Sequence, residues 1–173
     1  MCIIIDTNTL HLVFNRSESK HLEFKPVYNW IIYKNGVIVY GGSKYLTELS
    51  KTGKYLKLFV ELGKCNKTYK ADNSSVDQSE TELKKNYSPR KFNDHHLAAL
   101  VRVTKCRIIC TKDKSAIPHL KNNILYPKGI SKPMLYTKKS NEDLLNDKNI
   151  SECCKPCLRM KKEFIDAFNS LLN

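Results

Sequence analysis

The sequence predicts an α/β fold with one parallel, twisted sheet of about five strands, flanked by helices and followed by a C-terminal helical extension. Three short runs of apolar, largely β-branched residues, at 2–5, 37–40 and 107–111, are typical of strands buried on both faces. Between them lie segments whose apolar residues recur three and four positions apart, as in amphipathic helices. Strands that alternate with helices form parallel sheets, because each helix returns the chain over a face of the sheet.

The remaining elements follow in the same alternating order. The first half of the chain supplies a strand at 2–5, helices at 9–15 and 25–33, a strand at 37–40, helices at 43–49 and 55–62, and a strand at 67–71. The second half supplies helices at 74–86 and 94–104, a strand at 107–111, a helix capped by Ser115, and a strand at 133–137. Pro26 is expected in the first turn of its helix, which Asn35-Gly36 ends.

These elements divide the chain into two parts. Residues 1–137 form the predicted α/β domain, and 138–173 form a polar connector and a last helix. One face of that helix is apolar and must be buried against something, with Phe164, Ile165, Phe168 and Leu172 along it.

The chain is strongly basic, with 30 Lys and Arg against 17 Asp and Glu and a formal net charge of +13. Such an excess favours a polyanionic partner, most simply nucleic acid, although a lysine-rich composition also arises from the base composition of a genome. Lysines and tyrosines are interspersed after Glu48, and the tyrosines suit either base stacking or core packing. We expect nucleic-acid contacts from Lys51, Lys54, Lys57, Lys64, Lys67 and Lys70.

Apolar segments and cysteines bear on the cellular compartment. No apolar stretch approaches the roughly 18 residues of a membrane span, and the N-terminus lacks signal-peptide features, which predicts a cytoplasmic protein without membrane contact. The seven cysteines are then expected as thiols.

Three of these cysteines, Cys153, Cys154 and Cys157, form the motif CCKPC. Plain thiols, half of a zinc site completed by Cys65 or a histidine, and a redox role all remain open for it.

Acidic side chains follow the ends of the predicted strands. Asp6 comes directly after 2–5, Asp113 follows 107–111, and Glu48 lies on the helix after 37–40. Asp94 opens the helix that leads into 107–111, on the face of its apolar stripe. Ligands of open α/β sheets bind at the carboxyl ends of the strands, so we expect the four acids in one crevice.

Four carboxylates in one crevice repel one another, by about 4 kcal/mol for a pair ~4 Å apart at an effective dielectric constant near 20. A divalent cation that prefers oxygen ligands, Mg²⁺ or Mn²⁺, removes this repulsion. Combined with the basic charge, the pattern indicates metal-assisted hydrolysis of a phosphodiester. Simpler explanations also exist: Asp6 as a helix cap, Asp94 as a charge that favours the helix dipole after Asn93, and Glu48 as a surface partner of Lys44 or Lys51.

At these acids the chain resembles the PIN-domain nucleases. The resemblance rests on the stretches IIIDTNTL, VIVYGGSKYLTEL and NDHHLAALVRVTKCRIICTKD and on the α/β order that joins them. It covers about residues 1–136, which makes the 1–137 domain PIN-like. The family's pattern falls, in order, on Asp6 with Asn8, Ser43 with Glu48, Asp94, and Thr111 with Asp113.

The resemblance implies a metal-dependent endoribonuclease that hydrolyses RNA with Mg²⁺ or Mn²⁺. It implies that Asp6, Glu48, Asp94 and Asp113 are catalytic and bind the metal, supported by Asn8, Ser43 and Thr111. Many members are toxins paired with antitoxins, and others process RNA, so a toxin or defence effector and an RNA-processing enzyme are both implied. The segment 50–93 is longer than its counterpart in the compact toxins, and 138–173 extends beyond the usual end of the family's domain. Open questions are whether DNA is also cut, whether an antitoxin or other protein binds, and whether the chain forms a homodimer.

Two other classes compete with this interpretation. The haloacid-dehalogenase-like phosphatases open on a strand followed by Asp-x-Asp-x-Thr-Leu, which DTNTL matches except at Asn8. That chemistry needs an acid at this position to transfer a proton, which an amide cannot do. A non-catalytic RNA-binding or scaffold protein is the other alternative, but it gains nothing from carboxylates facing RNA phosphates. We also expect at least one of His95 and His96 to face solvent or phosphate.

Overall fold

The computed structural model describes residues 2–146 and 151–172, and it confirms the predicted fold class. One sheet has the strand order β3-β2-β1-β4-β5, and every neighbouring pair is parallel. The strands are β1 (Cys2–Ile5), β2 (Val37–Tyr40), β3 (Thr68–Lys70), β4 (Ile108–Cys110) and β5 (Met134–Tyr136). All five predicted strands are therefore present, with ends within a residue of the predicted ones.

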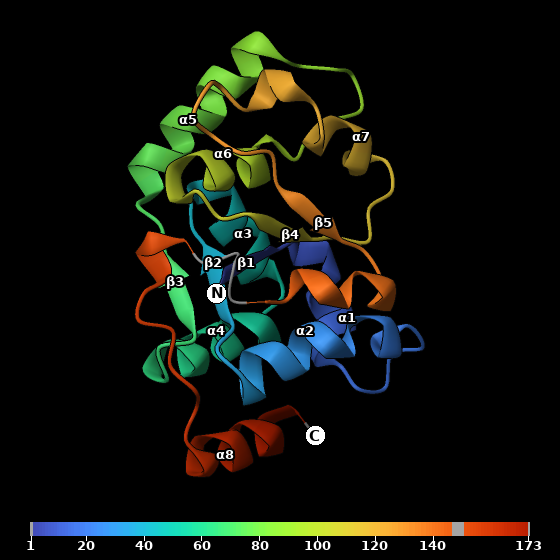
Figure 1. Ribbon diagram of the computed structural model, residues 1–173, viewed down its shortest axis with the longest axis vertical. Helices are drawn as coiled ribbons and strands as arrows, with labels where there is room; N and C mark the ends of the chain where they lie inside the picture. The colour runs from blue at the N-terminus through green and yellow to red at the C-terminus, as the bar shows by residue number, and fades with distance from the viewer. Residues whose placement is uncertain (1, 147–150, 173) are drawn as a thin grey trace.

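Helices cover both faces of the sheet (Figure 1). Those before β3 are α1 (Leu10–Phe14), α2 (His21–Tyr33), α3 (Ser43–Lys51) and α4 (Lys54–Lys64). Those after β3 are α5 (Asn73–Asn86), α6 (His95–Thr104) and α7 (Ala116–Leu120). In Figure 1, α1, α2 and α4 lie on one side of the strands, and α5, α6 and α7 lie on the other. This division follows from right-handed crossovers, since the chain moves outward from β1 first in one direction and then in the other.

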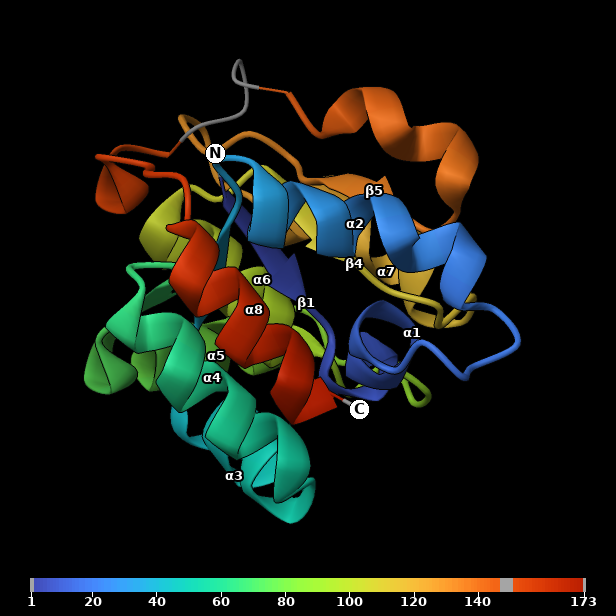
Figure 2. The same ribbon diagram turned by 90° about the horizontal axis from the view of Figure 1, so that it is seen from below.

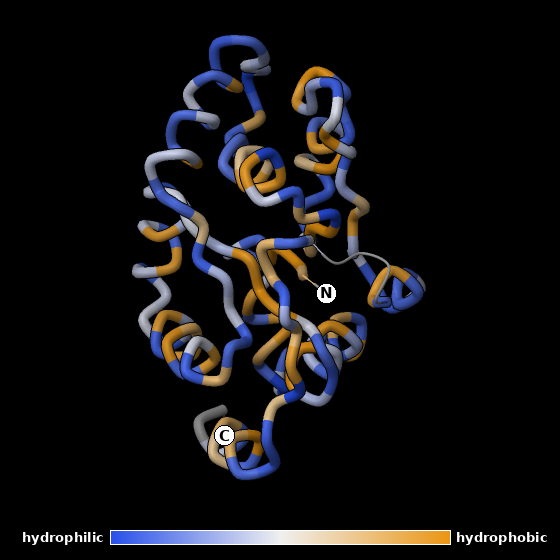
Figure 3. Tube along the Cα trace, turned by 60° about the vertical axis from the view of Figure 1, so that its left-hand side comes forward, coloured by the Kyte–Doolittle hydropathy of each residue, from blue (hydrophilic) through white to orange (hydrophobic). Residues whose placement is uncertain are grey.

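The central strands form the core. All four residues of β1 are fully buried, because β2 and β4 flank the strand and helices cover both faces. Figure 3 shows the hydrophobic residues concentrated along the inner strands, while the outer helices carry mixed faces. This burial explains why 2–5 is a continuous apolar run rather than an alternating one.

The second helix differs from the prediction. It begins at His21 rather than near Lys25, so Pro26 lies inside the helix instead of in its first turn. Proline leaves the carbonyl four residues earlier, that of Leu22, without its helical hydrogen bond. Leu22 is 69% exposed, so water can satisfy that carbonyl. The ring of Pro26 itself is buried, so the proline is tolerated because the carbonyl that it leaves without a helical partner belongs to an exposed residue.

The C-terminal extension folds back on the domain. It contains η3 (Lys139–Leu144), η5 (Glu152–Cys154) and α8 (Lys162–Leu172). Phe168 on α8 is 3% exposed and packs edge-on against Phe14 with ring centroids 6.4 Å apart. Tyr28 Oη donates a hydrogen bond to Asn169 Oδ1 at 2.6 Å. Figure 2 shows α8 lying along the side formed by α1, α2 and α4.

Burial along the apolar face of α8 is uneven. Phe168 is the buried anchor, Ile165 is half-buried, and Phe164 is 42% exposed. The side chain of Leu172, the fourth residue of the predicted face, lies outside the described residues. The helix therefore packs on its own chain through Phe168 and Asn169.

Candidate active site at the carboxyl end of the sheet

The strand order creates a crevice at the carboxyl ends of β1 and β4. From β1 the chain crosses to β2 on one side, whereas β4 occupies the other side, so the connections diverge there. Asp6 directly follows β1, and its backbone N–H donates to Cys110 O at 2.9 Å, extending the pairing with β4. Asp6 is therefore held at the bottom of the crevice, where its side chain is 3% exposed.

Hydrogen bonds fix the Asp6 carboxylate from two sides. Its Oδ1 accepts from the backbone N–H of Asn8 at 3.0 Å, and its Oδ2 accepts from Thr111 Oγ1 at 2.7 Å. Thr111 Oγ1 in turn accepts from the backbone N–H of Asp113 at 3.0 Å. Burial raises the pKa of Asp6, and Glu48 and Asp113 raise it further, while the two hydrogen bonds oppose them. Thr111 thus links the two acids that follow the central strands.

Asp94 comes to the same place from the start of α6. It occupies the cap position of that helix, where its side chain makes no capping hydrogen bond, and it is 9% exposed. Burial and the negative charges of Asp6, Asp113 and Glu48 raise the pKa of Asp94 to about 6, against the opposing charge of Lys44. An acid with this pKa, without a capping role, lies in a crevice that favours positive charge.

Glu48 faces the crevice from α3. Its Oε2 accepts from Thr7 Oγ1 at 2.7 Å, and His96 Nε2 lies 3.5 Å from the same oxygen without a hydrogen bond. Burial lowers the pKa of His96 to about 3, so this imidazole is neutral and the contact is not an ion pair. Glu48 is therefore positioned by α3 and by Thr7.

Both histidines of α6 are buried, which makes the expectation of a solvent-facing or phosphate-facing histidine wrong. His95 is 2% and His96 1% exposed. The first turn of α6 is covered by neighbouring elements. The ring of Phe92 packs at a tilt against His95 with centroids 4.5 Å apart, and Tyr45 of α3 lies edge-on to His96 at 6.3 Å. These neighbours bury both imidazole rings at the start of α6.

The remaining predicted supporting residues divide into two cases. Asn8 contributes its backbone N–H to Asp6, while its side chain is exposed. Ser43, at the start of α3, donates instead to Asp77 Oδ2 on α5 through its hydroxyl. The side chain of Ser43 thus joins α3 to α5 and is hydrogen-bonded to Asp77 rather than to one of the four acids.

Five of the six predicted nucleic-acid lysines are exposed, namely Lys51, Lys54, Lys57, Lys64 and Lys70. Lys67 is the exception, and its assignment as a surface contact is wrong. It is fully buried, and its Nζ donates to Lys34 O at 2.6 Å and Gly36 O at 3.3 Å. Desolvation lowers the pKa of Lys67 to about 8. The side chain turns inward, where its ammonium satisfies two backbone carbonyls of the turn that follows α2.

A groove of about 750 Å³ adjoins the crevice. Thr7, Asn8 and Asp113 line its inner side, and Tyr55 and Thr52 line part of its wall. The basic residues along it are His11, Lys20, Lys112 and Lys114. Sequence reasoning did not select these four, although Lys112 and Lys114 flank Asp113 directly. Their position beside Asp113 could have identified these two lysines in the sequence, because residues next to an acid at the end of a strand lie at the same edge of the sheet.

The donor chemistry fits a hard divalent cation. Carboxylate oxygens are the ligands that Mg²⁺ and Mn²⁺ prefer, and burial together with the charges of the other three acids raises the pKa of Asp94. The acids do not yet enclose one point: among residues 2–146 and 151–172, no three His, Cys, Asp or Glu side chains are arranged to hold an ion. Hydrogen bonds to Ser115 and Ala116 hold Asp113 Oδ1. Binding would require side-chain rotation.

The chain shows no match to known proteins in any of three comparisons, with family models, curated proteins or solved structures. Within the described part of the chain, none of the helices has the length and hydrophobicity that crossing a bilayer requires.

Proposed function

We propose that the protein is a cytoplasmic endoribonuclease of the PIN type that depends on Mg²⁺ or Mn²⁺. The supporting observation is Asp94, a nearly buried acid whose pKa is raised to about 6 by burial and by Asp6, Asp113 and Glu48. Burying like charges together is unfavourable unless a cation compensates them. The basic groove beside these acids supports a polyanionic substrate.

In this proposal Asp6, Glu48, Asp94 and Asp113 hold the cation, which supplies neutralisation of charge at the phosphate being cleaved. Thr111 and the Asn8 N–H keep the Asp6 carboxylate in one orientation. Lys112 and Lys114 bind phosphates next to the acids and set the position of the strand in the groove. Tyr55 offers a face on which a base stacks.

RNA binding without cleavage is the second candidate. It is favoured by the absence, among the described residues, of three ligating side chains already arranged around one point. It leaves unexplained why four acids gather where the groove would bring phosphates. The biological role, as a toxin with an antitoxin, a defence effector or a processing enzyme, depends on which RNA is bound.

Cleavage of total RNA tests the proposal and separates the two candidates. We expect purified protein to cut RNA when Mg²⁺ or Mn²⁺ is present, to stop on chelation, and to resume when the metal is restored. Mapped ends then identify the RNA, and a DNA substrate of the same sequence tests for selectivity. RNA binding without metal-dependent cutting would establish the non-catalytic candidate instead.

A contaminating nuclease is excluded by a matched pair of variants. Asp6→Asn should lose cleavage, whereas Asp143→Asn, an exposed acid on η3, should keep it. Equal cleavage by both variants would overturn the assignment of the crevice.

A further inference from the structure

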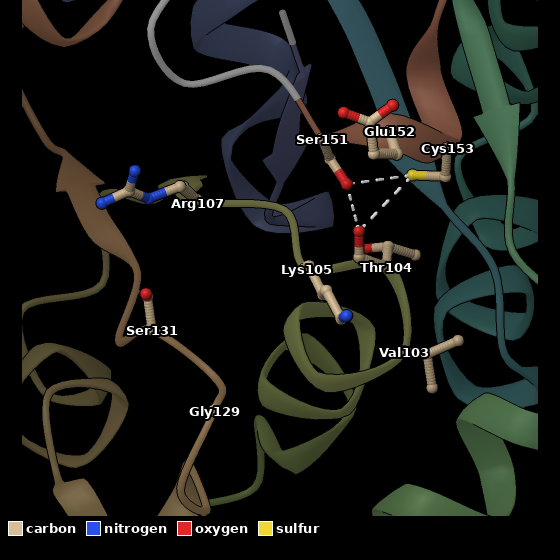
Figure 4. Close-up of a pocket in the computed structure, with 9 residues that line it drawn as sticks. All are labelled: Val103, Thr104, Lys105, Arg107, Gly129, Ser131, Ser151, Glu152 and Cys153. Atoms are coloured by element: carbon tan, nitrogen blue, oxygen red, sulfur yellow. Dashed lines mark hydrogen bonds between the residues drawn. The ribbon is translucent and has the colours of Figure 1, made fainter.

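A second pocket, of about 420 Å³, lies at the amino end of the same sheet, opposite the acids. It is lined by the end of α6, by the chain before β4 and by η5 of the extension (Figure 4). Cys153 is in its wall, and the sulfur faces Ser151 Oγ at 3.3 Å and Thr104 O at 3.5 Å. Lys105, Arg107 and Glu152 line the same pocket. The CCKPC motif therefore lies beside an open pocket and not beside the acids.

Behind Cys153 lies a cluster of thiols from three distant parts of the chain. Cys153 Sγ and Cys154 Sγ are 3.6 Å apart. The thiol of Cys2, at the start of β1, interacts with the thiols of Cys154 and Cys106. Cys106 precedes β4, so the pairing of β1 with β4 brings it to Cys2. The cluster is thus Cys153, Cys154, Cys2 and Cys106.

The arrangement of these thiols distinguishes zinc binding from oxidation. A structural zinc site needs three or four donors around one point. Among the described residues no three cysteines meet that condition. The thiols instead interact in a row, Cys153 with Cys154, Cys154 with Cys2, and Cys2 with Cys106. Contact between two sulfurs is what disulfide formation requires, because one sulfur attacks the other directly.

Cys153 is the accessible member of the cluster. It is half-buried and lines a further pocket with Tyr69, whereas Cys2 and Cys106 are fully buried. Hydrogen bonding to Cys154, helped by Ser151, lowers the pKa of Cys153 to about 7. A thiol with this pKa is about half ionised at pH 7, against about 3% for an ordinary thiol. Cys65, also half-buried, is the contrasting case, since burial raises its pKa.

We propose that Cys153 is a peroxide-reactive thiol and that its oxidation is resolved within the cluster as a disulfide between Cys2 and Cys154. Accessibility, ionisation and an adjacent second thiol are the properties that distinguish redox-reactive cysteines from structural ones. The product joins the first strand to the C-terminal extension, two segments separated by nearly the whole chain.

The reaction balances in three steps with hydrogen peroxide as oxidant. Cys153 sulfur attacks one peroxide oxygen, the O–O bond breaks, and the leaving hydroxide takes the thiol proton, giving a sulfenic acid and water. Cys154 sulfur attacks Cys153 sulfur, the S–O bond breaks, and hydroxide leaves as water with the Cys154 proton. Cys2 sulfur then attacks Cys154 sulfur, and Cys153 departs and takes the Cys2 proton. Two thiols and one peroxide yield one disulfide and two waters.

Oxidation of the full-length protein with one equivalent of hydrogen peroxide, followed by peptide mapping, tests the proposal. We expect a linked peptide that joins Cys2 to Cys154, and we expect dimedone added at early times to label Cys153. Cys153→Ser should slow disulfide formation about tenfold or more, because Cys2, Cys106 and Cys154, the thiols that remain in the cluster, are buried away from peroxide. Cys154→Ser should stop the reaction at the sulfenic acid, so that the dimedone adduct on Cys153 accumulates.

Cys65→Ser is the matched control and should oxidise as the wild type does. Unchanged kinetics in Cys153→Ser, or first labelling of Cys65 in the wild type, would overturn the proposal. The labelling order is measured on the unaltered protein, so it holds even if a variant folds poorly. None of these results depends on whether the protein cleaves RNA.

Discussion

The two ends of β1 show opposite chemistry within one strand length. Asp6 follows the carboxyl end and faces other acids, whereas Cys2 opens the amino end and faces other thiols. Both ends are buried, but burial acts on them differently. A thiol that ionises at the amino end is stabilised by hydrogen bonds from neighbouring thiols, whereas acids that gather must share protons or bind a cation. This difference is the basis of the two proposals, a cation and RNA at the carboxyl end and oxidation of the thiols at the amino end.

The largest expected effect separates the two ends by activity. Asp6→Asn and Asp94→Asn should each lower metal-dependent RNA cleavage by about 100-fold or more, because even residues that only support metal ligands contribute about 10–100-fold. Cys153→Ser should leave cleavage unchanged. Single-turnover rates at saturating Mn²⁺ provide the measurement. A comparable loss in Cys153→Ser would mean that the two ends act as one site.

The next effect compares a hydroxyl at each end. Thr111→Val removes the hydrogen bond to the Asp6 carboxylate, and Ser151→Ala removes one to Thr104 O, a neutral acceptor. Bonds to charged groups contribute about 1.5–3 kcal/mol and neutral ones about 1 kcal/mol, so Thr111→Val should reduce the free energy of unfolding more. Urea denaturation measures both. A larger loss of unfolding free energy in Ser151→Ala than in Thr111→Val would contradict this, and would mean that repulsion among the acids outweighs the hydrogen bond from Thr111 to Asp6.

A smaller effect concerns RNA affinity at the two ends. Lys112→Met with Lys114→Met should lower the slope of log affinity against log salt by about 1.4, since each phosphate contact on a single strand contributes about 0.7. Lys105→Met with Arg107→Met, at the amino end, should leave the slope unchanged. Binding titrations with catalytically inactive Asp6→Asn protein avoid cleavage. Equal slopes for both pairs would remove the groove from the proposed RNA path.

The smallest effect is on pH dependence. Asp94 has a pKa of about 6 in the folded protein against an ordinary 3.8, so the folded state binds this proton more tightly. Its stabilising contribution is complete below about pH 4 and declines as the pH rises through about 6. Asp94→Asn should therefore melt higher than the wild type near pH 7.5 in chelator and equally near pH 4. Asp143→Asn should match the wild type at both, and a lower melting temperature for Asp94→Asn near pH 7.5 would indicate a structural role for the carboxylate.

Local pattern was sufficient to predict the fold class. Continuous apolar runs identified the strands, and their alternation with helices required a parallel sheet. The same logic placed Asp6 and Asp113 together, because residues that follow parallel strands meet at one edge. Asp94 was predictable for a related reason, since its position on the apolar stripe of α6 turned it inward. The strands, the parallel sheet and the positions of these acids all follow from residues close together in the sequence, so they can be predicted from local pattern alone.

Long-range packing decided the rest. Lys67 is buried because two carbonyls near the end of α2 accept its ammonium, and His96 is buried because α3 covers the start of α6. The thiol cluster depends on the pairing of β1 with β4 and on the return of the extension to the amino end of the sheet. Residues 2, 106 and 154 have no pattern in common along the chain. Contacts of this kind arise only when distant segments exclude water together, so the sequence determined the elements and the tertiary structure determined their partners.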